Sequence, residues 1–250
     1  WQYSLSQSSK FSSQQNAGSV TPPTGFNYYA GITSLSSYTV GSSDYFMFNQ
    51  AIEGYNIADL SWGTSGAKTV TISFWVYSSL TGTFGGCLQN SSQNRSYPFS
   101  YTISSSNTWT YITITIPGDT AGTWNTNNTQ GIILRFGLGV GSTYSGTAGS
   151  WSGNKYFTCT GATSVVGTNG ATFYITGVQL EIGTAATPFE YRNYQQELAM
   201  AQRYYAKTFS QGTAPADNVT TTGALRGTAR LINASSQIEP AANWKFPVTM

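Results

Sequence analysis

The chain of 250 residues is long enough for one large domain or two smaller ones, and its net charge at neutral pH is only +2. Its 11 basic residues form no run, which argues against nucleic-acid binding, and no apolar stretch is long enough for membrane insertion. The chain has no histidine, which excludes the Ser-His-Asp and Cys-His catalytic arrangements and His-ligated zinc.

Residues 1–43 are rich in Ser, Gln and Gly and contain "TPPTG". Their strand signals are weak, so we expect an extended or loop-like entry segment.

From residue 44 to 192 the sequence predicts an antiparallel β-sandwich of jelly-roll type. Apolar side chains alternate with polar or aromatic ones in "YFMFNQAI", "TVTISFWVY", "TWTYITITI" and "IILRFGLGV". Long loops without a helical period connect these segments, which is typical of such a mainly β fold. In "FYITGVQLEI" the apolar positions change parity after Ile175, so we expect a β-bulge at Gly177.

A linking helix is predicted over residues 193–207. Pro188 favours an exit from the sheet, and Asn193 can cap a helix with Gln196 at its third position. Four residues form a stripe suited either to a short coiled coil or to packing on the chain's own sandwich: Tyr194, Leu198, Ala201 and Tyr205. Residues 208–250 read as the truncated start of a C-terminal β-module, since "NWKFPVTM" stops inside an alternating pattern.

The acidic residues and the two cysteines carry no recognisable catalytic or metal motif. We expect no catalytic residue, because no paired-carboxylate signature accompanies Asp44, Glu53, Asp59 or Asp119. Glu181 could bind a loop backbone, pair with Arg192 or contribute to a calcium site, but one carboxylate alone makes calcium the weaker reading. We therefore expect no cofactor or metal. Cys87 and Cys159 form either one disulfide or two buried thiols, with a preference for the thiols.

The aromatic residues are the candidate binding residues. Charged residues make up 8% of the chain and aromatic ones 15%, a composition that suits neutral polar ligands such as sugars. A glycan needs flat rings together with amide, hydroxyl or guanidinium groups. Three candidate faces meet this need: Trp75 and Tyr77 with Arg135; Trp109 and Tyr111; and the loop residues Trp62, Trp124 and Trp151. The alternative for each ring is packing under a loop or against a sister chain.

Several long phrases carry a family resemblance. They are "AIEGYNIADLSWGTSGAKTVTISFWVYSSLTGTFGGCLQN", "NRSYPFSYTISSSNTWTYITITIPGDTAGTW", "GSTYSGTAGSW" and "FYITGVQLEIGTAATPFEYRNYQQELAMAQRYY". Roughly residues 45 to 206 resemble the jelly-roll module near the C-termini of tailed-bacteriophage tail-fibre and related tail proteins. The resemblance implies a sandwich like a carbohydrate-binding module, usually assembled as a homotrimer in the virion. It implies no mapped binding site, and Cys87 and Cys159 depart from its usual pattern.

The sequence therefore predicts a virion tail-fibre or receptor-binding segment, located in the tail. We expect it to contact other tail or virion proteins and to attach to a bacterial surface polysaccharide without catalysis. The alternatives are a secreted carbohydrate-active enzyme or its accessory module, and a purely structural virion spacer.

Overall fold

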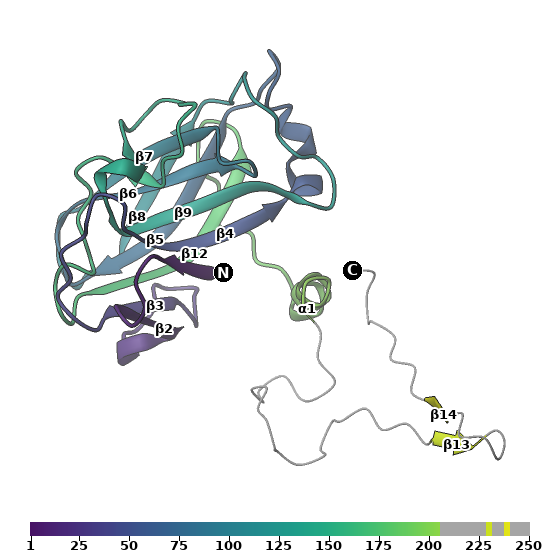
Figure 1. Cartoon of the computed structure of the whole chain (residues 1–250), viewed down its shortest axis with the longest axis horizontal. Coiled ribbons are helices and arrows are strands. Elements are labelled where there is room, and N and C mark those ends of the chain that lie inside the picture. Colours follow the sequence, from purple (N-terminus) through teal and green to yellow (C-terminus); the bar gives the residue numbers. More distant parts are fainter. Residues whose placement is uncertain (206–228, 232–237, 241–250) are drawn as a thin grey trace. The chain divides into compact units, whose positions relative to one another are not determined.

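The computed structural model describes residues 1–205, 229–231 and 238–240 (Figure 1). The chain divides into two compact units, Trp1–Phe189 and Glu190–Met250. The first unit is mainly β and consists of two five-stranded antiparallel sheets packed as a sandwich, which confirms the predicted fold class. Among the described residues, no helix is long and apolar enough to cross a membrane.

The first sheet has the strand order β1-β4-β9-β6-β7. Its strands are β1 (Gln2–Leu5), β4 (Tyr45–Glu53), β9 (Gln130–Val140), β6 (Gly82–Asn90) and β7 (Ser96–Ile103). The second sheet has the order β2-β3-β12-β5-β8. Its strands are β2 (Phe11–Gln15), β3 (Ala30–Ser34), β12 (Thr172–Ile182), β5 (Val70–Ser78) and β8 (Thr110–Ile116). Edge strands β1 and β2 follow one another in the chain.

Short elements complete the first unit. They are the 3-10 helices η1 (Ala17–Ser19), η2 (Gly54–Leu60) and η3 (Ser142–Tyr144), and a two-residue parallel pair, β10 (Ser145–Gly146) with β11 (Thr158–Cys159).

The core lies between the two sheets and is built from alternate residues of each strand. The inward positions of β5 illustrate this, because all four are fully buried: Val70, Ile72, Phe74 and Val76. Of the predicted inward positions of β9, Val140 at the strand end is half-buried and the others are buried: Ile132, Leu134, Phe136 and Leu138. Burial of such a side chain stabilises the fold by about 1.5–3 kcal/mol, so the apolar parity decides which face of each strand points inward.

The predicted bulge in β12 is confirmed. The pairing of β12 with β5 shifts register between Thr176 and Gln179, and Gly177 has a φ of 59°. A Cβ atom at Gly177 would lie 2.6 Å from Cζ of Phe26, so glycine also permits this close approach. The shift keeps Ile175 and Val178 both on the core side of the strand, although their sequence positions differ in parity.

The expectation of a loop-like entry over residues 1–43 is wrong for much of that segment. β1, β2 and β3 lie within it and belong to the two sheets. β1 pairs with β4 and β3 pairs with β12, so partners distant in sequence hold strands whose own apolar pattern is weak. The sandwich therefore starts well before residue 44.

The predicted helix begins where the sequence indicated. α1 (Tyr194–Gln202) starts after Asn193, whose Oδ1 accepts a hydrogen bond of 2.9 Å from the backbone N–H of Gln196. The helix ends earlier than expected, so Tyr205 lies beyond it. The predicted C-terminal β-module lies largely outside the described residues, which include only the antiparallel pair β13 (Ala229–Leu231) and β14 (Ile238–Pro240).

Candidate functional site

Four candidate ligand-binding residues share the outer face of the second sheet. β5 pairs with β8 so that Trp75 lies opposite Tyr111, and Tyr77 contacts Trp109, which immediately precedes β8. Because Phe74 and Val76 point into the core, their alternate neighbours on β5 must point outward. The two faces that were predicted separately from the sequence are thus one face, and we call these four residues the aromatic surface.

The rings of the aromatic surface lie in contact. The centroids of Trp75 and Tyr111 are 5.1 Å apart, and those of Tyr77 and Trp109 are 5.4 Å apart. Tyr77 also stacks on Tyr174 of β12, at 5.3 Å with an interplanar angle of 7°. Such distances are typical of favourable aromatic pairs, so each ring restricts the orientation of the next.

A buried pair of tyrosines supports one end of this surface. Tyr29 and Tyr174 are each 3% exposed, and their ring centroids are 5.1 Å apart. Burial raises the pKa of Tyr29, whose hydroxyl donates to the Ala17 carbonyl oxygen and accepts from the backbone N–H of Val20. The indole Nε1 of Trp109 donates to the Thr21 carbonyl oxygen at 2.8 Å. The loop that follows β2 therefore fixes the rings from one side.

The other end of the aromatic surface is open and polar. Tyr111 is 44% exposed, while Trp75, Tyr77 and Trp109 are half-buried. Further along β8, Thr113 is exposed on the same face. This arrangement combines accessible ring faces with hydroxyl groups and places no charged side chain among the four aromatic residues.

Glu181 lies on the same face of the second sheet, but its carboxylate is engaged locally. Its Oε1 accepts hydrogen bonds from Gln179 Nε2 at 3.0 Å and from the Thr187 backbone N–H at 2.9 Å, and its Oε2 accepts one from Thr187 Oγ1. Desolvation raises the pKa of Glu181, but the hydrogen bonds from Thr187 and Gln179 outweigh it and the net shift is downward. These contacts match the loop-binding alternative for Glu181.

No metal centre is evident among the residues that the structure describes. They contain no group of three or more His, Cys, Asp or Glu side chains placed to hold an ion. Cys87 and Cys159 are both free and buried rather than joined in a disulfide. Burial raises the pKa of both thiols, so neither is a nucleophile near neutral pH.

Arg135 does not join the aromatic surface, contrary to the prediction that its strand might lie beside β5. It belongs to β9 in the first sheet and is 5% exposed. Its Nε donates to Gln89 Oε1 at 2.9 Å, its Nη1 donates to Asn49 Oδ1 at 3.3 Å, and its guanidinium lies 4.8 Å from the ring centroid of Phe157. Burial lowers the pKa of Arg135 to about 10, so it remains a cation at neutral pH.

The three loop tryptophans form a packed cluster instead of a binding face. Trp62 and Trp124 are buried, and their ring centroids are 4.7 Å apart. Trp151 contacts both rings edge-on, and its Nε1 donates to the Pro117 carbonyl oxygen at 2.7 Å. This cluster packs beneath loops, which was the alternative considered for these rings.

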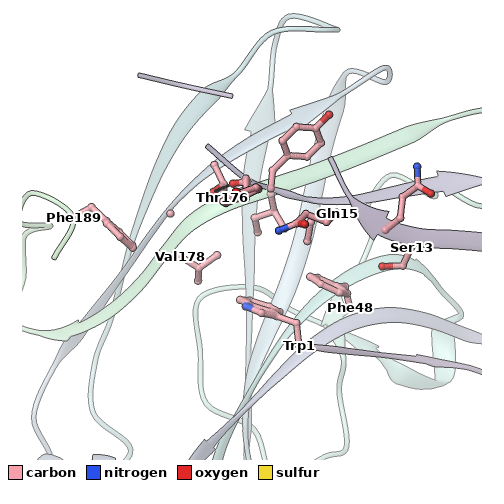
Figure 2. A pocket seen from close by; sticks show the side chains of 13 residues that line it. Trp1, Ser13, Gln15, Phe48, Thr176, Val178 and Phe189 are labelled. Carbon is pink, nitrogen blue, oxygen red and sulfur yellow. Dashed lines mark hydrogen bonds between the residues drawn. The ribbon is translucent and has the colours of Figure 1, made fainter. Parts of the chain in front are cut away.

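A pocket of about 500 Å³ that was not predicted from the sequence lies between residues of the two sheets, and we call it the inter-sheet pocket. Figure 2 shows Trp1 and Phe48 on one side of it and Gln15 and Thr176 on the other, with Ser13 at one end. The complete lining is Trp1, Ser13, Gln14, Gln15, Tyr28, Tyr29, Ala30, Phe48, Ile175, Thr176, Gly177, Val178 and Phe189. The sequence signal for this pocket is "FSSQQ" at residues 11–15. Its alternate positions are Phe, Ser and Gln, so one face of this strand is not uniformly apolar.

Comparisons with known proteins show likenesses of fold only. No family model and no curated protein matches the chain. A structure titled "CBM4 structure and function" is 18% identical, with 62% of this chain and 71% of that chain covered and a TM-score of 0.37. The family 11 carbohydrate-binding module of Lic26A-Cel5E from Clostridium thermocellum is 15% identical, with coverage of 74% and 88% and a TM-score of 0.35.

A phage protein is among the similar structures. The enzymatically active domain of tailspike protein 4 from Bacteriophage CBA120 is 12% identical and has a TM-score of 0.42. The match covers 73% of this chain but only 19% of that one. At these identities and TM-scores, none of the three structures identifies a ligand or a family for this chain.

Substitution of Arg135 should affect stability rather than ligand binding. Arg135→Ala leaves Gln89 and Asn49 without a buried donor, so we expect a loss of about 2–4 kcal/mol in the free energy of unfolding, measured by urea denaturation. Arg135→Met retains most of the volume and should lose less. An Arg135→Ala variant that is as stable as the parent protein but no longer binds glycan would contradict this structural role and show that Arg135 is a binding residue.

Proposed function

We propose that the sandwich binds neutral glycans on its aromatic surface without catalysis, as the attachment module of a virion tail. The observation that carries this proposal is the convergence of Trp75, Tyr77, Trp109 and Tyr111 on one face of one sheet. Sugar rings present flat C–H faces to aromatic rings and hydroxyl groups to nearby polar side chains. An open row of rings suits an extended saccharide better than an enclosed small molecule.

The electrostatics of this face favour an uncharged ligand. The aromatic surface contains no acidic or basic residue, and the nearby Glu181 carboxylate is engaged by Gln179 and Thr187. A charged saccharide would lack a counter-charge among these residues, whereas a neutral one needs only ring stacking and hydrogen bonds. Such binding requires no cofactor. We therefore propose neither a cofactor nor a calcium ion at this surface.

Absence of catalysis is supported by the structural roles of the carboxylates. Asp44 accepts hydrogen bonds from Ser6 Oγ, Tyr38 Oη and the backbone N–H of Gly41. Asp119 is 1% exposed and forms a bidentate pair with Arg95, with N···O distances of 2.6 and 2.7 Å. Carboxylates fixed in this way hold loops together and are poorly placed to act as an acid and nucleophile pair across a glycosidic bond.

The assignment to a virion tail is supported by the sequence resemblance over roughly residues 45 to 206. In that setting the partners would be other tail or virion proteins and a bacterial surface polysaccharide. An accessory module of a secreted carbohydrate-active enzyme would use the same surface, and a spacer would not bind glycan at all.

We further propose that α1 assembles three copies of the chain. The helix has nine residues, and isolated helices shorter than about 12–15 residues are marginal in water. Tyr194 is 67% exposed at its start, Leu198 is half-buried, and the small Ala201 would permit close approach of a second helix. Packing of these residues against sister helices would stabilise α1 and present several weak binding surfaces together.

Truncation of a ring on the aromatic surface should weaken glycan binding. Trp75→Ala removes the partner of Tyr111, so we expect about a tenfold loss in apparent affinity for bound neutral polysaccharides on a glycan array. The matched control is Tyr55→Ala, since Tyr55 is 60% exposed but lies on η2, outside the aromatic surface. Unchanged binding by Trp75→Ala, with its fold intact by circular dichroism, would reject this site, and absence of binding by the parent protein would favour the spacer.

Incubation of the full chain with a bound polysaccharide should release no reducing ends. The expectation follows from the carboxylates fixed by Arg95, Tyr38 and Thr187. Release that disappears when an Asp or Glu residue is substituted would show that the protein is an enzyme.

Substitution in the helix should alter assembly. Leu198→Asp places a charge in the predicted seam, so trimers should become monomers in analytical ultracentrifugation, with the β-type circular dichroism retained. Gln195→Asp is the control, because Gln195 is exposed and outside the stripe. A Leu198→Asp variant that remains trimeric would contradict a helix-based assembly.

A further inference from the structure

The inter-sheet pocket lies where the sandwich is left unfilled beside its edge strand β2. Residues 11, 13 and 15 of this strand point between the sheets, because Ser13 pairs with the core residue Ile32 and Gln15 pairs with Ala30. Phe11 is buried in the core, whereas Ser13 and Gln15 are exposed and line the pocket. Small and polar side chains at two inward positions therefore leave a space that apolar residues would close.

An aromatic wall faces these polar side chains. Trp1 stacks on Phe48 with centroids 4.9 Å apart and an interplanar angle of 8°. Phe48 is 3% exposed, but Trp1 is 53% exposed, so the outer indole face is accessible beside the pocket (Figure 2). Ile175 and Val178 supply apolar lining from β12. The pocket thus combines a flat ring with apolar walls.

Hydrogen-bonding groups line the opposite side. The side chains of Ser13 and Gln15 have no hydrogen-bond partner among the residues that the structure describes, so their hydroxyl and amide groups are available to a ligand. Thr176 Oγ1 donates to the Tyr28 carbonyl oxygen at 2.7 Å, which fixes that part of the rim. The lining contains no Asp, Glu, Lys or Arg.

We propose that the inter-sheet pocket binds a neutral mono- or disaccharide unit, such as the terminal or branch sugar of a longer glycan. Its volume of about 500 Å³ lies within the range of about 300–1,000 Å³ that is usual for small-molecule sites. A purely apolar ligand would leave the amide of Gln15 and the hydroxyl of Ser13 unpaired, whereas a sugar offers both a C–H face to Trp1 and hydroxyl groups to these side chains. An ionic ligand would meet no charged side chain in the lining.

The pocket would extend the proposed function. The choice of a saccharide as its ligand rests on the proposed glycan binding of the sandwich. Thr176 of the pocket rim pairs directly opposite Trp75 of the aromatic surface. A glycan lying on that surface could therefore place one unit in the pocket. The two sites nevertheless consist of different residues, so each can be tested alone.

Fluorine NMR of the full chain labelled with 5-fluorotryptophan separates the two sites. Methyl glycosides of glucose, galactose, mannose and N-acetylglucosamine are the pocket probes, and neutral polysaccharides are the probes of the aromatic surface. Substitutions Trp1→Phe and Trp75→Phe assign the two resonances. We expect at least one methyl glycoside to shift the Trp1 resonance while leaving that of Trp75 in place.

Two neighbouring serines provide a matched pair of variants. Ser13→Phe adds a ring inside the pocket and should abolish the Trp1 shift, whereas Ser12→Phe adds the same ring on the outer face of β2 and should retain it. If Ser13→Phe does not fold, Gln15→Ala should raise the dissociation constant about threefold to tenfold by removing one hydrogen-bonding group.

The outcomes distinguish the pocket from the aromatic surface. A Trp1 resonance that no methyl glycoside shifts overturns the pocket proposal, even if polysaccharides shift the Trp75 resonance and support the aromatic surface. Equal binding by the Ser13→Phe and parent proteins also overturns it, as does a preference for glucuronic acid over the neutral sugars. A shift at Trp1 without any polysaccharide effect at Trp75 supports the pocket and rejects the aromatic surface.

Discussion

Burial of one face of every long strand is the constraint on which the rest of this structure depends. In β5, a slip of one residue would turn four fully buried apolar side chains to the outer face of the sheet and bring Thr, Ser and aromatic side chains into the core. At about 1.5–3 kcal/mol for each apolar side chain that loses its burial, even a partial loss is large compared with the stability of an ordinary domain. The same constraint forces Trp75 and Tyr77 outward, so the packing of the core also determines the position of the aromatic surface.

The two outer faces of the sandwich differ in how much of each is covered by the chain. On the first sheet, Arg135 and Gln89 are buried, and Gln89 Nε2 donates to the Tyr156 carbonyl oxygen at 3.1 Å. Ser96 Oγ donates to the Asn154 carbonyl oxygen, which holds the same covering segment. On the second sheet the loop after β2 covers the end that contains Tyr29 and Tyr174. The segment after β12 covers part of the other end, where the hydroxyls of Thr71 and Thr115 donate to the Gly183 and Thr184 carbonyl oxygens. Ring faces consequently remain accessible on this second sheet.

Most groups that could perform chemistry have structural roles here. Asp119 joins Arg95, and Glu181 holds Thr187. Both cysteines are buried, and their raised pKa values keep them protonated. What remains accessible is largely uncharged: aromatic rings, hydroxyl groups and amides. Weak individual contacts of this kind gain strength when several copies of a surface engage one repetitive ligand, so the proposed assembly would strengthen the proposed glycan binding.

The sequence alone determined features that depend on near neighbours along the chain. The period of two in "TVTISFWVY" predicted its buried face, the parity change predicted the bulge at Gly177, and Asn193 predicted the helix start. Features that depend on strand pairing required the tertiary structure, because partners are chosen by contacts between distant segments. Strand pairing places Trp75 opposite Tyr111 and places Arg135 in the other sheet. It also forms strands from weakly patterned segments before residue 44. The inter-sheet pocket likewise needs both sheets, since Trp1 and Phe48 come from one and Ser13 and Gln15 from the other.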